Sequence, residues 1–349
     1  MSDIHDQVKD YYGKQLEKSD DLKTNACCTV VSYPKHIKEA LAQIHDEVMS
    51  KYYGCGLTIP DNLKGTKVLD LGSGSGRDCY LVSKLTGEEG RVVGVDMTDE
   101  QLNVANRHIE YHAQKFGHTK SNVTFLKGNI DKLEELDLGQ NTFDIIISNC
   151  VINLVKDKKK VIQDCYNLLN EGGEMYFSDV YASRRIPQKL VDDPVLYGEC
   201  LSGALYWNDF EEIAKEVGFK DPRVVESALI TVNNPELESK VEGYKFYSIT
   251  YRLFKHEKLE RGQEDYGLKI KYLGTIEESP EKFILDKDYT FEKNTPIPVD
   301  GNTARMIKYS RYNSHFAIEG SFCTHLGEFS NNKSNPKLNE QKSGGNSCC

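Results

Sequence analysis

The chain has no apolar run long enough to span a bilayer, and its first ten residues, MSDIHDQVKD, are too polar for a signal peptide. It also has no excess of positive charge. Its formal net charge is −10, which argues against nucleic acid or an anionic membrane as a partner. We therefore expect a cytoplasmic protein, in a compartment where thiols are kept reduced.

Several motifs that mark common enzymes are also missing. The sequence contains no HExxH of zinc proteases, no GxSxG of serine hydrolases and no P-loop. Its ten cysteines include no CxxC pair, so the spacing of a zinc ribbon is absent. Any site for a soft ion must therefore be assembled from cysteines that lie far apart in the chain.

What the sequence does contain is one strong motif, KVLDLGSGSGRDCY, at residues 67–80. Its apolar residues predict a buried strand with Asp70 near the carboxyl end, and a helical pattern begins at about Asp78. Glycines at 72, 74 and 76 lie between the two. Glycine lets a backbone turn sharply and approach a ligand closely. An open α/β sheet binds its ligand at this place, outside the carboxyl ends of its strands.

The spacing of the glycines distinguishes between cofactors. A dinucleotide-binding fingerprint is GxGxxG and would need glycine at 77, where Arg77 stands. A second predicted strand, RVVGVD, ends at Asp96, an acid placed to accept the hydroxyl pair of a ribose. A GxGxG loop preceded by an acid resembles the first motif of methyltransferases that use S-adenosylmethionine (SAM).

The residues around this motif alternate between helical and strand patterns. A helix is predicted over 37–48, and another over 99–116 with Gly117 as its cap. Strands follow at 122–128 and 143–149, then a helix over 157–169 that Gly172 and Gly173 stop, then a fifth strand, EMYFSDV. Near-continuous apolar strands with this alternation predict a doubly wound parallel sheet.

Past Val180 the alternation breaks down. Residues 181–205 are rich in turn formers, and a helix over 207–217 and two strand-like runs, RVVESALITV and YKFYSITYRLF, follow them. Beyond His256 the chain is polar and β-like, with one helical stretch near 303–312. The residues from about 330 to 349 are poor in apolar side chains, and we expect them to be disordered.

Six segments together resemble arsenite methyltransferases: YYGCG, DLGSGSGRDCY, GVDMT, ISNCVINL, FSDVY and GECLSGALY. The resemblance covers roughly residues 20 to 255. It implies a class I SAM-methyltransferase core with a Rossmann-like doubly wound sheet. Three domains are expected: N-terminal helices with the SAM-binding core over 1–186, an inserted arsenic-binding domain over 187–257, and a small β-rich accessory domain over 258–349.

The resemblance also implies an arsenic site made of cysteines. Trivalent arsenic binds thiolates, carries three ligands in a pyramid and keeps one lone pair. Cys55, Cys150 and Cys200 are the implied ligands, and Cys27 is implied as a fourth functional cysteine. The neighbouring Cys28 is a candidate for the same role.

The cofactor residues follow from the same resemblance. Asp96 is expected to bind the ribose, Met97 and Ile130 to flank the adenine, and Tyr53 to border the reacting methyl group, where an aromatic face favours a sulfonium cation. The full expected set is Asp70, Gly72, Ser73, Gly74, Gly76, Arg77, Asp78, Asp96, Met97, Gln101, Asn129, Ile130 and Ser148.

The implied reaction is a methyl transfer to the arsenic lone pair, which needs no general base because a lone pair carries no proton. Arsenite and methylarsenite, delivered as thiol conjugates, are the expected substrates, and mono- and dimethylated arsenicals are the expected products. A thiol reductant, glutathione or thioredoxin, is expected to restore oxidised cysteines. We expect a monomer.

Other interpretations of these residues stay open at this point. Cys150 alone could be a buried structural thiol, and Cys79, Cys165 and Cys323 are assigned no chemistry. The terminal Cys348 and Cys349 lack a prenylation box. His108, His112 and His118 are assigned to a solvated helix face. A SAM methyltransferase acting on another small nucleophile, or an arsenic-binding thiol protein without turnover, are the alternative functions.

Overall fold

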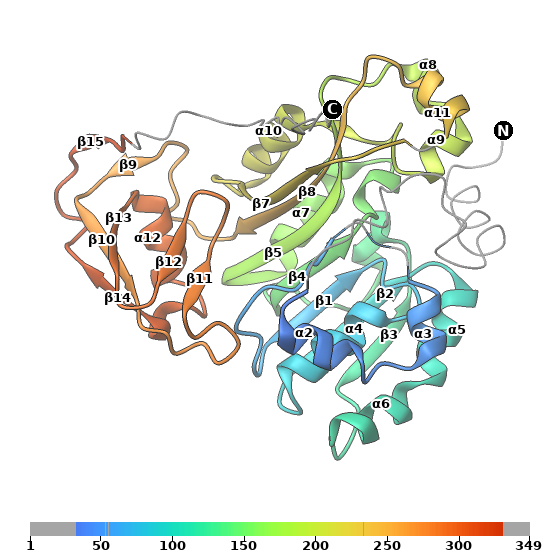
Figure 1. Ribbon diagram of the computed structural model, residues 1–349, viewed down its shortest axis with the longest axis horizontal. Helices are drawn as coiled ribbons and strands as arrows, with labels where there is room; N and C mark the ends of the chain where they lie inside the picture. The colour runs from blue at the N-terminus through green and yellow to red at the C-terminus, as the bar shows by residue number, and fades with distance from the viewer. Residues whose placement is uncertain (1–32, 53, 55, 233, 331–349) are drawn as a thin grey trace, which may run out of the picture.

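The fold is organised around a mixed central sheet, whose strands spread across the view in Figure 1, and helices pack on both of its faces. The computed structural model describes residues 33–52, 54, 56–232 and 234–330. The strand order is β3-β2-β1-β4-β5-β8-β7, with β6 pairing with β5 off this path. The strands are β1 (Lys67–Leu71), β2 (Arg91–Asp96), β3 (Val123–Lys127), β4 (Phe143–Asn149), β5 (Leu169–Ala182), β6 (Leu205–Tyr206), β7 (Arg223–Leu229) and β8 (Phe246–Phe254).

The first five strands run parallel, and alternate residues along them serve two different cores. Val68 points into a cluster built with α2 (Lys35–Leu41), α3 (Asp46–Ser50), α4 (Arg77–Thr86), α5 (Asp99–Arg107) and α6 (Ile109–Phe116). Leu69 points to the opposite face, which η3 (Ile130–Glu135), η4 (Ile152–Leu154), α7 (Lys158–Leu168) and α10 (Trp207–Val217) cover. Burial on both faces explains the near-continuous apolar strands and confirms the predicted doubly wound core.

The segment expected to bind arsenic is partly built into this sheet. Both β7 and β8 come from residues 187–257, and β8 pairs antiparallel with β5 on one side and β7 on the other. The short helices α8 (Gln188–Val191), α9 (Pro194–Gly198) and α11 (Pro235–Lys240) form a separate apolar cluster beyond the strand ends. The boundaries of this segment as a domain stay a prediction.

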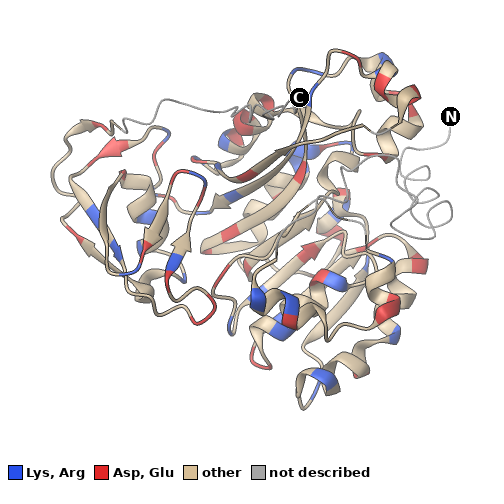
Figure 2. Ribbon diagram, viewed as in Figure 1, with Lys and Arg blue, Asp and Glu red and all other residues tan. Residues whose placement is uncertain are grey.

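A small β-rich unit follows β8, as expected for the C-terminal part. Its strands are β9 (Glu264–Asp265), β10 (Leu268–Tyr272), β11 (Lys282–Ile284), β12 (Thr290–Glu292), β13 (Pro296–Val299), β14 (Phe316–Glu319) and β15 (Gly327–Glu328), with α12 (Gly301–Lys308) and η5 (Asn313–His315). Phe254, the last residue of β8, packs in the same apolar core as this unit. In Figure 2, the positions of basic residues (blue) and acidic residues (red) are interspersed along the visible ribbon rather than gathered on one element.

Three of the predicted helices differ in the structure. The helix expected over 37–48 is two helices, α2 and α3, because His45 caps α3 by accepting the amide of Glu47 at Nδ1 (3.1 Å). The helix expected over 99–116 is divided at His108 into α5 and α6. The helix expected near 303–312 begins and ends earlier, at Gly301 and Lys308.

Gly172 lies inside the long strand β5 rather than after a helix end. It has φ of +81°, and a Cβ there would lie 2.0 Å from the carbonyl oxygen of Tyr309. Glycine at this position therefore permits a close approach of the C-terminal unit to the sheet.

The assignment of His108 and His112 to a solvated face is wrong, because α3 covers this part of α5 and α6. His108 is buried and its Nε2 lies 2.7 Å from Glu47 Oε2. His112 is buried under Tyr80, with ring centroids 3.6 Å apart, and its Nε2 accepts the backbone amide of His45. His118 is half-buried.

The predicted N-terminal helix and the predicted disordered tail lie outside the described residues. Among the residues that are described, no helix has both the length and the apolar character needed to cross a bilayer.

Candidate functional site

The glycine-rich turn connects β1 to α4, as the sequence predicts. Gly74 has φ of +52°, and no atom lies within 4 Å of where its Cβ would be, so the backbone here faces open space. Gly76 has φ of +88°, and a Cβ there would lie 2.6 Å from the ring of Phe125 on β3. One glycine therefore exposes backbone to a ligand, and the other lets α4 pack against the sheet.

Asp96 ties this turn to the end of the neighbouring strand. One carboxylate oxygen accepts the amide of Gly74 (2.9 Å), and the other accepts the amide of Thr98 (2.8 Å). Burial raises the pKa of Asp96, and these amide hydrogen bonds act in the opposite direction. The acid at the end of β2 and the glycine loop after β1 thus belong to one site.

A pocket opens at the carboxyl ends of β1, β2 and β4. Ten of the predicted cofactor residues line it: Asp70, Gly72, Ser73, Gly74, Asp78, Asp96, Met97, Gln101, Asn129 and Ile130. Cys150, the first residue after β4, lines it as well. The structure therefore brings together most of the residues that the resemblance implies.

Three predicted cofactor residues do not line the pocket. Gly76 packs against β3, and Ser148 is buried with its Oγ 3.3 Å from the carbonyl oxygen of Leu71. Arg77 is buried beside Asp78 (2.9 Å) and lies over the ring of Tyr52, 3.7 Å from its centroid. Arg77 therefore acts on the pocket through Tyr52, which lines it.

The pocket is acidic, because Asp70, Asp78 and Asp96 all line it. Burial and the nearby charge of Asp78 raise the pKa of Asp70 to about 8, although the Cys79 thiol donates a hydrogen bond to it (3.2 Å). Buried carboxyl groups this close together favour a cationic ligand. A sulfonium compound such as SAM fits this requirement.

Two buried polar atoms in the pocket wall also fit a bound cofactor. Ser73 Oγ and Gln101 Oε1 are both buried, and neither has a hydrogen-bond partner among the residues that the structure describes. An unpaired buried polar atom is costly, so a ligand that offers hydrogen-bonding groups here stabilises the site.

Cys150 and Cys200 lie side by side at the edge of this pocket. The Cys200 Sγ is 3.6 Å from the carbonyl oxygen of Cys150, and both residues are buried in the apolar cluster around Leu196 and Leu201. Cys200 is a free thiol, and Cys150 is disulfide-bonded. The backbone amide of Cys150 donates to Ser178 on β5 (2.9 Å), which fixes it at the strand end.

Both cysteines have an unusual backbone conformation. Their φ angles are +57° for Cys150 and +60° for Cys200, in the left-handed region that residues with a side chain rarely adopt. Such strained positions cost roughly 1–3 kcal/mol each and cluster at functional sites. The sequence around Cys150 and Cys200 did not predict this backbone conformation.

The other cysteines have separate surroundings. Cys79 and Cys165 are buried within α4 and α7, and burial raises the pKa of each thiol. Cys323 is exposed in the C-terminal unit. Cys27, Cys28, Cys55, Tyr53, Cys348 and Cys349 lie outside the described residues.

Several pocket residues were not predicted from the sequence: Lys51, Tyr52, Ser75, Thr98, Gly128, Asn149, Val151, Leu154 and Val155. Six of these lay inside segments already singled out: Tyr52 in YYGCG, Ser75 in DLGSGSGRDCY, Thr98 in GVDMT, and Asn149, Val151 and Leu154 in ISNCVINL. Val155, just beyond the last segment, carried no signal of its own, because a buried core gives the same apolar pattern.

Comparisons with known proteins match this chain over nearly its whole length. A family model for a methyltransferase domain matches residues 62–218, and one for the arsenite methyltransferase C-terminal domain matches residues 266–348. An arsenite methyltransferase of Aquipseudomonas alcaligenes is 52% identical over 326 residues, covering 93% of this chain and 94% of that protein. An arsenite methyltransferase of Homo sapiens is 46% identical over 318 residues, covering 91% and 84%.

A solved structure is similar over the same span. It is CrArsM, an arsenic(III) S-adenosylmethionine methyltransferase from Chlamydomonas reinhardtii, with a TM-score of 0.83 and 48% identity. The match covers 86% of this chain and 100% of that one.

Proposed function

This chain belongs to the family of SAM-dependent arsenite methyltransferases, and on that premise we propose which of its residues hold the methyl donor and which hold arsenic. The observation that carries the proposal is the position of Cys150. It lines the acidic pocket and lies against Cys200, so a thiolate site and a cofactor pocket share one residue.

The methyl donor is held by the acidic pocket. Asp96 binds the ribose hydroxyl groups, and its carboxylate keeps the glycine loop in place through the amide of Gly74. Asp70 and Asp78 face the cationic part of the donor, and Ser73 and Gln101 offer it their buried polar atoms. When bound, SAM supplies an electrophilic methyl group on a sulfonium sulfur.

The arsenic is held by thiolates at the edge of the same pocket. Cys150 and Cys200 provide two ligands, and Cys55 provides the third. Cys27, or its neighbour Cys28, acts in bringing in or recycling arsenic. Thiolates suit this substrate because soft ligands bind soft ions.

The residues act on the reaction mainly by positioning. The arsenic lone pair forms the new As–C bond as the methyl–sulfur bond breaks, and the electron pair of that bond leaves with sulfur. No side chain has to remove a proton. The three thiolates direct the lone pair toward the pocket, and their electron donation enriches the arsenic.

The electron balance of this step requires a thiol reductant. Using its lone pair raises the formal oxidation state of arsenic by two. The free thiolate of Cys27 or Cys28 then attacks the sulfur of Cys55, and a disulfide forms between them as the bond from Cys55 to arsenic breaks. The electron pair of that bond returns arsenic to the trivalent state, and Cys150 and Cys200 stay bound to it. We propose that glutathione or thioredoxin reduces this disulfide.

We also propose the form of the substrates and the products of this reaction. Arsenite and methylarsenite arrive as thiol conjugates, since exchange between thiolates transfers arsenic without free hydroxide. Mono- and dimethylated arsenicals are the products. We also propose that the protein works as a monomer.

The order of ligand loss gives the sharpest test. Once arsenic carries one methyl group, two thiolates are enough to hold it, and we assign the lasting pair to Cys150 and Cys200. Cys200→Ser should therefore give no product from arsenite or from methylarsenite. Cys55→Ser should fail on arsenite but still methylate methylarsenite.

The control is Cys165→Ser, which removes a buried thiol on α7 and should keep both reactions. Each variant receives either substrate with SAM and excess thiol, and arsenic speciation resolves the products. Circular dichroism shows that each variant is folded. Full activity in a folded Cys200→Ser enzyme would refute the thiolate site.

A further inference from the structure

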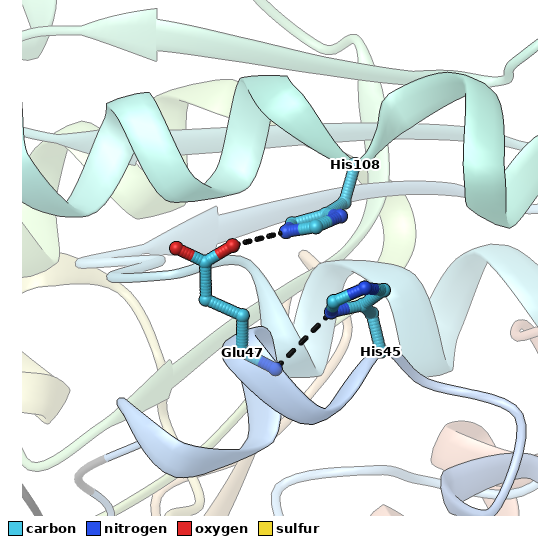
Figure 3. A group of neighbouring side chains, drawn as sticks. All are labelled: His45, Glu47 and His108. Atoms are coloured by element: carbon cyan, nitrogen blue, oxygen red, sulfur yellow. Dashed lines mark hydrogen bonds and ion pairs between the residues drawn. The ribbon is translucent and has the colours of Figure 1, made fainter.

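A second cluster of ligand-type side chains lies apart from the residues that line the cofactor pocket. It consists of His45 at the start of α3, Glu47 in the first turn of α3, and His108 between α5 and α6. Each residue offers a ligand atom, and the three atoms lie within 4.8 Å of one another. Figure 3 shows the two imidazole rings face to face, with the Glu47 carboxylate at the edge of the His108 ring.

The rings are held in this arrangement by neighbouring groups. The His45 and His108 rings stack with centroids 3.8 Å apart. His112 forms hydrogen bonds with the backbone of both residues. Its Nε2 accepts the amide of His45 (3.2 Å), and its Nδ1 lies 2.8 Å from the carbonyl oxygen of His108. Burial lowers the pKa of His112 to about 4, so this ring stays neutral and keeps both bonds.

The carboxylate is also fixed. Glu47 Oε2 lies 2.7 Å from His108 Nε2, and Glu47 Oε1 pairs with Arg107 at 2.7 Å. The hydrogen bond to His108 and the charges of Arg107 and His108 lower the pKa of Glu47. Both carboxylate oxygens are thus held in place by neighbouring side chains. Partners that orient the ligands of a metal in this way are typical of built metal sites.

We propose that His45, Glu47 and His108 bind a divalent transition-metal ion of the zinc class. Two imidazoles and one carboxylate are a set that zinc uses, with water at the fourth position. Nitrogen ligands favour Zn²⁺, Co²⁺ or Ni²⁺ over Mg²⁺ or Ca²⁺. The ion would replace the proton between His108 and Glu47. At His45 it would take the lone pair that now accepts the Glu47 amide, or the ring would turn over to offer Nε2.

The position of this cluster gives it a structural consequence. Helix α3 leads directly into Lys51 and Tyr52, which line the cofactor pocket. Thr98 is the N-cap of helix α5 and Gln101 lies in its first turn, and both residues line the same pocket. A metal ion here would therefore connect two walls of the donor site to each other.

The experiment has to separate this site from the cysteines, which also bind zinc. We use the full chain with accessible thiols blocked by N-ethylmaleimide, and titrate it with Co²⁺ while recording the visible spectrum. Nitrogen and oxygen ligands give weak d–d bands, and thiolate ligands add intense charge-transfer bands in the near ultraviolet. Thermal unfolding with and without Zn²⁺ gives a second measurement.

Two variants remove one ligand each. His108→Gln removes an imidazole, and His45→Asn removes the other while keeping a side chain that caps α3 well. Both should weaken Co²⁺ binding by at least about tenfold, the scale lost when even an outer partner of a metal ligand is removed. Both should also lose the rise in melting temperature with Zn²⁺.

The matched control is His325→Gln. His325 forms the same kind of His–Glu pair, with its Nε2 2.9 Å from Glu264 in the C-terminal unit. Among the described residues, however, this pair belongs to no three-residue cluster of ligand-type side chains. This variant should bind Co²⁺ like the parent protein. The proposal is overturned if the parent protein binds no Co²⁺ at 1:1 stoichiometry in the micromolar range, if the bands are those of thiolate ligands, or if His108→Gln leaves the spectrum unchanged.

Discussion

The charge of Asp70 in the donor pocket depends strongly on the surroundings of its carboxyl group. Its pKa rises from the ordinary 3.8 to about 8, first through burial and then through the charge of Asp78. In the free protein Asp70 is therefore mainly protonated at pH 7. A cationic donor favours the carboxylate, so binding should release a proton from this group.

From this we predict that SAM affinity rises with pH between about 6 and 9, because less work is needed to ionise Asp70. Isothermal titration calorimetry in buffers of different ionisation enthalpy measures both the affinity and the proton release. The same acid lowers the stability of the free protein as the pH rises from about 4 to about 8, between the ordinary pKa of 3.8 and the raised pKa of Asp70. A carboxyl group with a raised pKa stabilises the folded state at low pH, and that contribution is lost as the pH rises toward 8.

Two comparisons make the prediction specific. Asp70→Asn cannot ionise, so its affinity for SAM should be weaker and much flatter with pH. S-adenosylhomocysteine keeps the amino group but lacks the sulfonium charge, so its affinity should depend less on pH than that of SAM. Equal pH slopes for the parent protein and Asp70→Asn would exclude Asp70 as the titrating group.

At the scale of single residues, the three acids and two of the three glycines predicted for the cofactor site line the pocket, because a glycine loop between a strand and a helix has a strict geometry. Gly76, Arg77 and Ser148 were predicted as well, and none of them lines the pocket. A motif predicts which segment forms a site. Whether a given side chain of that segment reaches the site depends on its neighbours from elsewhere in the chain, as Arg77 lies over the ring of Tyr52.

At the scale of elements, the contact between α3 and the glycine loop closes the donor site. Ser75 Oγ is buried and lies 2.9 Å from the carbonyl oxygen of Val48 and 3.3 Å from that of Lys51. The hydroxyl donates to these carbonyls and so joins the loop to the end of α3. Lys51 and Tyr52, just beyond, line the pocket.

We predict that Ser75→Ala weakens SAM binding by about two- to tenfold, because a hydrogen bond of this kind contributes roughly 0.5–1.5 kcal/mol. Ser50→Ala is the matched control, since the exposed Ser50 hydroxyl bonds only within α3, to the carbonyl oxygen of Glu47 (3.0 Å). Fluorescence or calorimetric titration with SAM compares the two. An unchanged affinity in Ser75→Ala, or an equal loss in Ser50→Ala, would contradict the role of this contact.

The apolar periodicity of the sequence predicted where most helices and strands lie. It did not predict where a helix is interrupted or how the strands are ordered in the sheet. The apolar pattern over 99–116 continues through His108, and only the packing of α3 against this point divides the helix. The strand-like character of β7 and β8 was visible in their sequences. Their order in the sheet, with β8 between β5 and β7, depends on pairing between strands that lie far apart in the chain, and no local sequence pattern predicts such pairing.

At the scale of the whole molecule, a buried ion network joins the central sheet to the C-terminal unit. Glu174 on β5 is fully buried and pairs with Arg252 on β8 (2.8 Å) and with Arg311 just after α12. Burial alone would raise the pKa of Glu174, but the two guanidinium groups outweigh it and the pKa is lowered. Arg311 also donates to the carbonyl oxygen of Asp61 (2.9 Å), so the network reaches the segment before β1.

Glu174→Gln should lower the free energy of unfolding by about 3–5 kcal/mol, because it leaves the buried Arg252 and the partly buried Arg311 without their common partner. Urea denaturation, followed by circular dichroism, measures the change. The control is Glu216→Gln, which breaks an exposed pair with Lys159 (2.7 Å) and should cost no more than about 1 kcal/mol. A loss below about 1 kcal/mol for Glu174→Gln would show that the network contributes little to holding the molecule together.

The place of β8 in the sheet also has a consequence for the nascent protein. During synthesis β5 leaves the ribosome first, then β7, and β8 only afterwards, although β8 lies between them in space. Until Phe246–Phe254 emerge, β5 has a free edge and Glu174 lacks both arginines. An unpaired strand edge is a template for wrong pairing. The chain therefore passes through a vulnerable period on the ribosome, which ends only when Arg252 and then Arg311 have been added.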